Sequence, residues 1–325
     1  MAMLHGDMVC LVTGGAGFIG SHLVDFLMNS GETVRVLDNL SAGDLDNLSS
    51  WLSSPRLKVF QGDVLNKEFV YKALDGCDTV FHLAANPEIR SEKASPQDHF
   101  KQNIEATHNL LECMREVGGV KRFVFASTST VYGEPSEIPT PETYGPLKPI
   151  SHYGASKLAS EALSMSYASM CEFGCVIYRL ANVVGPRSDH GVIYDFVQKL
   201  KVAPSRLEVL GDGTQSKSYL YVDDCIAGIM AGLDDLDGEI CVYNIGSNDR
   251  VDVMSIANAV IDAMALENVE ICTTGGVRGG RGWKGDVKKM QLDMSLLNSR
   301  GWRPKLSSIE AVRKTARSIV TVIRY

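Results

Sequence analysis

The stretch VTGGAGFIGSHL, residues 12–23, constrains the fold of this 325-residue chain more than any other. An apolar run at residues 8–13 predicts a buried strand just before it, and its glycines are spaced G-x-x-G-x-x-G: Gly14, Gly17 and Gly20. Glycine allows a sharp turn and lets the backbone approach a pyrophosphate, which the N-terminus of a following helix binds with unpaired N–H groups. A glycine turn alone is a weak indication, but between a strand and a helix it predicts the first βαβ unit of a dinucleotide-binding fold.

Short apolar runs then alternate with helical patterns along the first half of the chain. They predict strands at residues 33–37, 57–60, 79–83, 122–126 and 176–180, and helices at residues 17–29, 67–74, 96–117 and 151–173. Alternating strands and helices imply a parallel sheet that is covered on both faces. The predicted fold class is therefore α/β, with a doubly wound Rossmann sheet.

This alternation of strands and helices changes after Asn182, where prolines and glycines separate shorter predicted elements. A strand and a helix return at residues 219–233, and another strand is predicted at residues 242–245. The expected division of the chain is a Rossmann domain at residues 1–180 with return segments at about 217–248, and a smaller C-terminal lobe at residues 181–216 and 249–325.

Charge and composition exclude several classes of protein. The formal net charge of −7 argues against nucleic acid as the main partner, because phosphate binding leaves a basic footprint. No apolar run is long enough to span a membrane, and the N-terminus shows no secretory signal. The eight cysteines are scattered without a C-x-x-C pair, which favours reduced thiols in a cytoplasmic protein over a disulfide frame or a metal site.

Asp38 ends the second predicted strand, within VLDNLSAG at residues 36–43. An acidic residue about 20 positions after the glycine turn binds a ribose 2′-hydroxyl and repels a 2′-phosphate, so Asp38 favours NAD over NADP. The alternative is a simple turn aspartate, which the glycine turn before it makes the weaker interpretation. Asp63, in QGDVLN, is a candidate for the adenine end, although an aspartate that caps the next helix explains it equally well.

Tyr153 and Lys157 stand four residues apart in HYGASKLASEA, so they share a face of the predicted helix at residues 151–173. A free phenol has a pKa near ~10 and is a poor base at neutral pH. A nearby ammonium and a cationic nicotinamide ring would both favour the phenolate. The Y-x-x-x-K pattern is frequent by chance, but after a dinucleotide fold it predicts that Tyr153 is a catalytic base and Lys157 its electrostatic partner.

Three motifs together resemble the extended short-chain dehydrogenase/reductase family: TGGAGFIG at residues 13–20, STSTVYG at 127–133 and YGASK at 153–157. Within that family the chain is most similar to the nucleotide-sugar epimerases that act on UDP-hexoses. Further stretches match as well: RLANVVGPR at residues 179–187, GDGTQSKSYLYVDD at 211–224 and YNIGS at 243–247. The resemblance covers nearly the whole chain.

The resemblance implies NAD as a tightly held cofactor. The residues that it places against NAD come from the glycine turn, the strand ends and two helices: Gly14, Gly17, Phe18, Ile19, Gly20, Asp38, Asn39, Asp63, Val64, Leu83, Ala84, Ala85, Asn103 and Lys157. His82, at the end of a predicted strand, is expected to be structural.

The resemblance also implies that Thr128 helps to hold the sugar's 4-hydroxyl, with Ser127 as a weaker candidate. Sugar dehydratases of the family carry an Asp-Glu pair at the next two positions and uronate decarboxylases keep a glutamate, whereas this chain has Ser129 and Thr130. Neither hydroxyl can remove a proton beside a ketone. This absence favours 4-epimerisation through a transient 4-keto sugar, or simple redox chemistry, with Tyr153 as the base.

The implied substrate is a UDP-sugar, which the C-terminal lobe helps to bind. The implied contacts are Thr128, Tyr153, Asn182, Lys217, Tyr219 and Arg281. Lys217 stands where the family often has an arginine and lacks its bidentate fork, and Tyr219 is equally explained as a packed strand aromatic. The stretch RGGRGWKGDV at residues 278–287 departs from the family motif, so Arg278 competes with Arg281, and solvated loop arginines are the alternative.

These expectations describe an NAD-dependent isomerase, a 4-epimerase of a UDP-hexose. Two alternatives stay open: a 4-epimerase of another UDP-sugar, such as a uronate, an N-acetylhexosamine or a pentose, and a non-catalytic NAD-sensing protein on the same fold. The family usually pairs through long helices such as residues 96–117 and 151–173, so a homodimer is expected.

Overall fold

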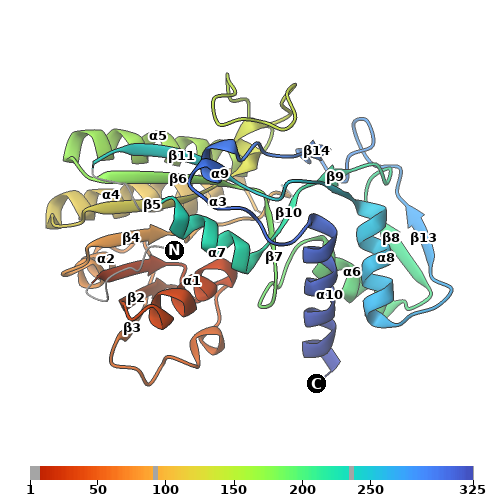
Figure 1. Ribbon diagram of the computed structural model, residues 1–325, viewed down its shortest axis with the longest axis horizontal. Helices are drawn as coiled ribbons and strands as arrows, with labels where there is room; N and C mark the ends of the chain where they lie inside the picture. The colour runs from red at the N-terminus through yellow and green to blue at the C-terminus, as the bar shows by residue number, and fades with distance from the viewer. Residues whose placement is uncertain (1–7, 91–93, 234–237, 325) are drawn as a thin grey trace.

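The core of the molecule is one parallel sheet, seen in a computed structural model that describes residues 8–90, 94–233 and 238–324 (Figure 1). Its strands are β1 (Val9–Thr13), β2 (Thr33–Asp38), β3 (Leu57–Gln61), β4 (Thr79–His82), β5 (Arg122–Thr128), β6 (Gly174–Leu180) and β11 (Ile240–Ile245). They lie in the order β3-β2-β1-β4-β5-β6-β11, and every neighbouring pair is parallel. The order reverses between β1 and β4, which confirms the predicted doubly wound Rossmann sheet.

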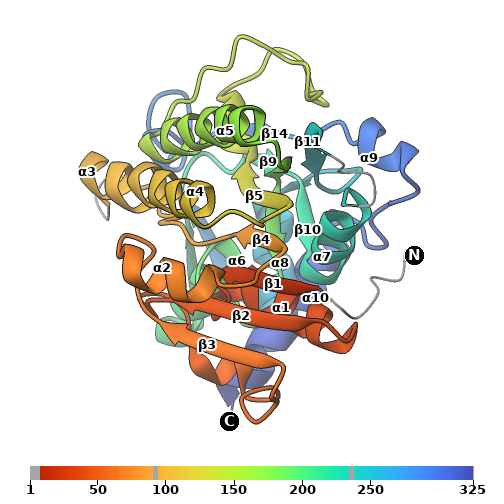
Figure 2. The same ribbon diagram turned by 90° about the vertical axis from the view of Figure 1, so that its left-hand side faces the viewer.

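Helices cover both faces of this sheet (Figure 2). They are α1 (Phe18–Asn29), α2 (Lys67–Leu74), α4 (Ala106–Val117), α5 (His152–Cys171) and α7 (Val222–Ala231). Successive side chains of a strand point to opposite faces, so in β1 Leu11 packs into the cluster formed with α2, α4 and α5, whereas Cys10 and Val12 pack into the cluster formed with α1 and α7. Because the strands are buried on both sides, they read as continuous apolar runs.

The predicted helix at residues 96–117 is not one regular α-helix. It consists of α3 (Pro96–His99), a π-helical segment η2 (Phe100–Glu105) and α4. Ser95 caps its start by accepting a hydrogen bond from the backbone N–H of Asp98 at 3.2 Å. A π-helical turn leaves the apolar pattern helical, so periodicity does not reveal it, and such turns are frequent at functional sites.

The rest of the chain after β6 builds shorter elements beside the sheet (Figure 1). They are β7 (Asn182–Val184), α6 (Val192–Val202), β8 (Arg206–Val209), β9 (Ser216–Lys217), β10 (Tyr219–Tyr221), β12 (Val251–Asp252), α8 (Val253–Met264), β13 (Glu270–Thr273), β14 (Lys289–Met290), α9 (Ser295–Ser299) and α10 (Ser308–Arg324). Two 3₁₀ turns, η1 (Leu45–Leu48) and η3 (Ser129–Tyr132), follow β2 and β5. Within this stretch, α7 and β11 return to the main sheet, and the predicted strand at residues 242–245 is confirmed as part of β11.

Across the described ranges, no helix has both the length and the apolar character of a membrane span. All eight cysteines are free thiols. The same ranges contain no group of three or more histidine, cysteine, aspartate or glutamate side chains arranged to hold a metal ion.

Candidate active site

The glycine turn (residues 14–20) lies at the carboxyl end of β1, and its shape is fixed by the chain itself. Gly14 has a φ of 69°, and a Cβ there would come within 2.8 Å of the backbone nitrogen of Ala84. A Cβ on Gly20 would come within 2.1 Å of the carbonyl oxygen of Gly14, whereas one on Gly17 would meet only that oxygen, at 3.3 Å. Gly14 and Gly20 are therefore required by packing inside the protein, whereas a Cβ on Gly17 would make one tight contact without a clash.

Helix α1 starts directly at this turn, and Gly17 provides no side-chain hydrogen bond to cap it. The first N–H groups of a helix have no partner within the helix and carry its positive dipole end. A glycine at the helix start and uncapped amides together fit an anionic pyrophosphate, as the cofactor prediction requires.

Asp38 closes the turn from the end of β2. Its carboxylate is buried and accepts two backbone hydrogen bonds, from Ala16 at 2.9 Å and from Leu40 at 2.9 Å. A carboxylate offers about four lone-pair sites, so two remain for ribose hydroxyls. Asp38 therefore shapes the turn, and its contact with a cofactor ribose stays a prediction.

The residues predicted near the adenine are joined to one another. The carboxylate of Asp63 accepts from the side-chain amide of Asn39 at 2.8 Å and from the backbone N–H of Leu65 at 2.9 Å. The carbonyl of Val64 accepts from the side chain of Asn109 at 2.5 Å, which ties this loop to α4. A hydrogen bond therefore connects the two candidate cofactor loops, which follow β2 and β3.

Asn103, which was predicted to lie near the cofactor ribose, is buried and bonded within the chain. Its amide oxygen accepts from the backbone of Asn86 at 2.7 Å, and its amide nitrogen donates to the hydroxyl of Ser156 at 2.9 Å and to the carbonyl of Asn86 at 3.2 Å. Asn103 thus connects the loop after β4 to helix α5 through hydrogen bonds. A direct contact between Asn103 and the cofactor stays a prediction.

The loop after β4 lies against the glycine turn, as the cofactor contacts predicted for Leu83, Ala84 and Ala85 need. The backbone nitrogens of Leu83 and Ala84 donate to the carbonyl and the hydroxyl of Thr13, at 3.2 and 3.3 Å. His82 is fully buried, and hydroxyl groups occupy both of its ring nitrogens, Thr13 at 2.7 Å and Thr107 at 3.0 Å. Burial lowers the pKa of His82 to about 3, and the charge of Lys157 adds to the effect, so the ring is a neutral structural group.

Helix α5 brings Tyr153 to Thr128 at the carboxyl end of β5. The hydroxyl of Thr128 accepts from the backbone N–H and from the hydroxyl of Thr130, both at 3.2 Å. Burial raises the pKa of Tyr153 to about 12, and a side-chain hydrogen bond with Thr128 opposes that rise. Tyr153 as a whole residue is intermediate in exposure, and its phenol is the buried part.

Lys157 lies one turn further along α5 and is 2% exposed. Its ammonium is 4.1 Å from the centroid of the Phe125 ring, a cation–π contact. Burial lowers the pKa of Lys157 to about 7, while the charge of Glu161 raises it. The expected lowering of the Tyr153 pKa by Lys157 is not seen here, because burial disfavours the charged forms of both groups.

Residues predicted to hold the diphosphate come together in part. Asn182 of β7 and Tyr219 of β10 are direct partners in a parallel pair, and Lys217 precedes Tyr219 by two positions. Tyr219 is buried, which suits a packed strand aromatic, and the amide nitrogen of Asn182 donates to the carbonyl of Ser218 at 3.1 Å.

Both predicted phosphate-binding cations are paired with carboxylates. The ammonium of Lys217 lies 2.6 Å from Asp286, and 5.5 Å from the centroid of the Trp283 ring. The guanidinium of Arg281 makes a forked ion pair with Glu134, which lies in the segment after η3. These carboxylates would have to be displaced, or supplemented, by a bound diphosphate.

Three neighbours of the site were not among the residues predicted from the sequence. The ring of His99 is buried beside Tyr153, with centroids 6.2 Å apart. Glu161 and Arg179 form a buried ion pair behind Lys157. Helical spacing puts Glu161 on the face of Tyr153 and Lys157, so that residue could have been found, whereas His99 and Arg179 come from other elements.

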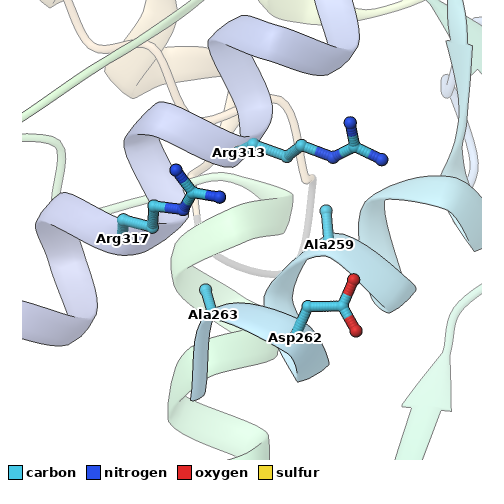
Figure 3. Close-up of a pocket in the computed structure, with 5 residues that line it drawn as sticks. All are labelled: Ala259, Asp262, Ala263, Arg313 and Arg317. Carbon is cyan, nitrogen blue, oxygen red and sulfur yellow. The ribbon is translucent and has the colours of Figure 1, made fainter. Parts of the chain in front are cut away.

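The structure also contains a hollow between α8 and α10 (Figure 3), lined by Ala259, Asp262, Ala263, Arg313 and Arg317. The two arginines extend from α10, and Asp262 comes from α8. None of the predicted site residues belongs to either helix, so this hollow is not the candidate active site.

Residues 10–246 match the model of the NAD dependent epimerase/dehydratase family. A putative UDP-glucose 4-epimerase of Methanocaldococcus jannaschii is 32% identical over 94% of this chain and 96% of its own length. UDP-glucuronic acid decarboxylase 1 of Arabidopsis thaliana is 34% identical over 93% of this chain and 67% of its own length. Relatives with two different reactions are therefore about equally similar.

Solved structures agree with this picture. A UDP-galactose 4-epimerase is 42% identical, with a TM-score of 0.85, over 97% of this chain and all of its own. A UDP-glucuronic acid 4-epimerase from Bacillus cereus, in complex with UDP-glucuronic acid and NAD, is 29% identical with a TM-score of 0.86, over 97% of this chain and all of its own.

Proposed function

This chain belongs to the NAD-dependent epimerase/dehydratase family, and from that membership we propose that it interconverts UDP-glucose and UDP-galactose by epimerisation at C4. The resemblance to the extended short-chain dehydrogenase/reductases and the prediction of NAD as cofactor are both confirmed by the family and by neighbours that hold NAD. Family membership alone leaves epimerases, dehydratases and decarboxylases as candidates.

The observation that carries the proposal is the setting of Tyr153. The phenol meets the hydroxyl of Thr128, and the two residues after Thr128 are Ser129 and Thr130. Thr130 serves to hold Thr128 through two hydrogen bonds. At the two positions after Thr128 the chain therefore offers hydroxyls in place of carboxylic acids, which supports epimerisation over elimination or decarboxylation.

In this proposal Tyr153 takes the proton of the sugar's 4-hydroxyl and later returns it. The glycine turn and Asp38 would hold NAD, which would supply reversible hydride acceptance at C4 of the sugar. Thr128 holds the C4 oxygen, because its hydroxyl can both donate to a ketone and accept from an alcohol. Lys157 stabilises the phenolate and binds the nicotinamide ribose.

Proton transfer needs more positive charge than Lys157 provides alone, since burial raises the pKa of Tyr153 to about 12. A cationic ring next to the phenol favours its ionised form. Tyr153 would thus become a base only in the loaded enzyme, which keeps proton transfer coupled to hydride transfer.

The substrate's diphosphate would lie between Asn182 and Arg281 of the C-terminal lobe (residues 181–216 and 249–325) and Lys217 and Tyr219 of the return segment at about 217–248. Lys217 and Arg281 are each held by a carboxylate. We infer that they exchange these partners for phosphate oxygens, since cations bind phosphate by charge-assisted hydrogen bonds.

We also infer a cytoplasmic homodimer that pairs through the helices around α4 and α5. Apolar side chains on these helices are unusually exposed: Phe100 at 52%, Val117 at 43% and Met170 at 80%. Light scattering of the purified protein tests this inference, and a monomer at micromolar concentration would contradict it.

The decisive assay offers the purified enzyme a panel of UDP-sugars without added reductant. UDP-galactose should give UDP-glucose, and Tyr153→Phe should abolish turnover while NAD stays bound. Turnover of UDP-glucuronic acid alone would favour a uronate 4-epimerase, the alternative supported by the neighbour that binds that sugar. No epimerisation of any UDP-sugar would overturn the proposal and leave an NAD-binding protein.

A further inference from the structure

Glu161 is a charged residue that the proposed reaction does not use. It lies on α5 one turn beyond Lys157 and two turns beyond Tyr153, and its exposed fraction is 0%. Glutamate is almost never fully buried unless it is paired. Its position behind the catalytic side chains calls for a physical reason.

Every partner of Glu161 belongs to a strand that ends at the site. Its carboxylate accepts from the guanidinium of Arg179 on β6, at 2.8 and 3.1 Å, and from the hydroxyl of Ser127 on β5. Ser127 is the residue just before Thr128. The carboxylate therefore ties α5 to the strand that carries the second catalytic hydroxyl.

Arg179 extends the connection to η3 and to the segment that follows it. Its guanidinium donates to the hydroxyl of Tyr132 in η3 at 3.0 Å and to the carbonyl of Glu142 at 3.2 Å. Tyr132 in turn donates to the side chain of Asn244 on β11 at 2.8 Å. One polar chain thus runs from α5 across β5, β6 and β11 to the segment after η3.

Stability alone does not account for this arrangement. Removing two charges from water costs free energy that their attraction seldom repays, and well-packed apolar residues of the same volume often serve as well. A buried ion pair is better explained when it sets the position or the charge of something next to it.

We propose, building on the proposed function, that Glu161 is a positioning residue: its ion pair with Arg179 and its hydrogen bond with Ser127 hold the Lys157 ammonium and the Thr128 hydroxyl in place around Tyr153. Glu161 touches neither substrate nor cofactor in this role. It acts through Lys157, which shares its helix face, and through Ser127, the chain neighbour of Thr128.

The charges around Lys157 predict the direction in which its pKa shifts when Glu161 or Arg179 is replaced. On α5 Glu161 favours the ammonium. On β4 His82 is neutral, on β5 the neighbours are the Phe125 ring and the hydroxyl of Ser127, and on β6 Arg179 carries a positive charge. Glu161 therefore favours the ammonium of Lys157, and Arg179 offsets the charge of Glu161 through their ion pair.

The test titrates Lys157 in the NAD-loaded enzyme by NMR of ¹³C-lysine-labelled protein, with Lys157→Met to assign the signal. Glu161→Gln removes the carboxylate that favours the ammonium and should lower the pKa of Lys157 by about one unit or more, because an opposite charge nearby stabilises the charged form. Arg179→Met should raise it. Shifts in the same direction, or no shift in either variant, would overturn the proposal.

Kinetics give the second readout. Glu161→Gln should lower kcat about tenfold or more at neutral pH with little change in KM, the signature of lost acid–base positioning rather than lost binding. The surface ion pair of Glu112 and Arg115 on α4 offers a matched control, and Arg115→Met should leave kcat and the Lys157 titration unchanged.

The double variant Glu161→Met, Arg179→Met covers the case in which a single variant does not fold. Removing both charges should restore stability but not kcat, and Lys157 should still titrate below its wild-type pKa. Wild-type kcat and titration in the double variant would show a purely structural ion pair. Because the titration needs no turnover, it tests this proposal even if the enzyme epimerises no UDP-sugar.

Discussion

The two ends of the candidate site are built in different ways. At the cofactor end, the glycine turn is fixed by backbone contacts, and Gly14 and Gly20 have no room for a Cβ. At the diphosphate end, the loop of residues 274–288 and its neighbours are held by ion pairs such as Lys217 with Asp286 and Arg281 with Glu134. The predicted cofactor end is thus preformed by the backbone, whereas the predicted substrate end consists of charged side chains that can exchange their ion-pair partners.

This difference matches how the two ligands would be used. A cofactor that is regenerated within each cycle can be held by a rigid cradle, because it does not have to leave. A substrate must enter, turn over and depart, and binding groups with alternative partners make exchange possible without leaving buried charges unpaired.

The largest effect is expected from adding a methyl group to the cofactor end. Gly20→Ala puts a Cβ where the carbonyl of Gly14 lies, and should cost about 3 kcal/mol of unfolding free energy, the upper end of typical overpacking. Chemical denaturation followed by circular dichroism measures the loss.

Gly17→Ala is the matched control for this variant. Its Cβ would contact only the carbonyl oxygen of Gly14, at 3.3 Å, so the unfolding free energy should change by less than about 1 kcal/mol. NAD affinity should nevertheless fall, since the pyrophosphate is predicted to bind against the backbone at Gly17. Equal loss of stability in both variants would mean that the turn is not selectively rigid.

A smaller effect is expected from removing a cation at the substrate end. Lys217→Ala should raise KM for UDP-galactose roughly tenfold to a hundredfold, the value of one charge-assisted hydrogen bond, with little change in kcat. Stability should fall as well, because the buried carboxylate of Asp286 would keep only the hydrogen bond from the backbone of Gly282 at 3.1 Å. An unaltered KM in steady-state assays would remove Lys217 from the diphosphate site.

The same logic predicts a gain when a competing carboxylate is neutralised. Glu134→Gln frees Arg281 from its ion pair and should lower KM by about twofold to threefold, the range of exposed ion pairs. Glu137→Gln, in the same segment, serves as a control that should leave KM unchanged. A higher KM in Glu134→Gln would show that the ion pair shapes the site instead of competing with substrate.

The smallest effect concerns pH. Lys288 anchors the loop of residues 274–288. Its ammonium donates to Asp212 at 2.6 Å and to the carbonyl of Gly279 at 2.9 Å. The hydrogen bond from Lys288 holds the pKa of Asp212 below its usual range. A lowered pKa stabilises the fold above the ordinary aspartate pKa of about 4, and the contribution is lost as pH falls further.

The protection of the amides of residues 274–288, relative to the slower intrinsic exchange at low pH, should therefore fall below about pH 4, while the glycine turn keeps its protection. Lys288→Met should remove this pH dependence. If the variant and the wild type show the same acid-dependent exchange, the anchoring does not depend on Asp212.

The sequence predicted most of the sheet because parallel strands that are buried on both faces leave strong apolar runs. It did not reveal the π-helical segment η2. The hydroxyl of Thr107 donates to the carbonyl of Asn103 four positions earlier, so these residues keep the spacing of an ordinary α-helix. The glycine turn was also visible, because its residues are adjacent in the chain.

The partners of the predicted cations were not visible. Lys217 and Asp286 are 69 positions apart, and Arg281 and Glu134 are 147 apart. Only the folded chain brings them together, and a charged residue in a loop gives no sign of which carboxylate it meets. For the same reason, Arg179 could not be assigned to Glu161 from spacing alone.

The position of β11 at the sheet's edge has a consequence for synthesis of the protein. β6 ends at Leu180, but the strand that pairs with its free edge begins only at Ile240, so the roughly 60 intervening residues take on the order of 3 to 12 seconds to translate at 5–20 residues per second. During that interval a nascent chain exposes an apolar strand edge, which is a template for wrong pairing. Chaperones that bind extended apolar segments would find their target in this window, before the ribosome has finished the chain.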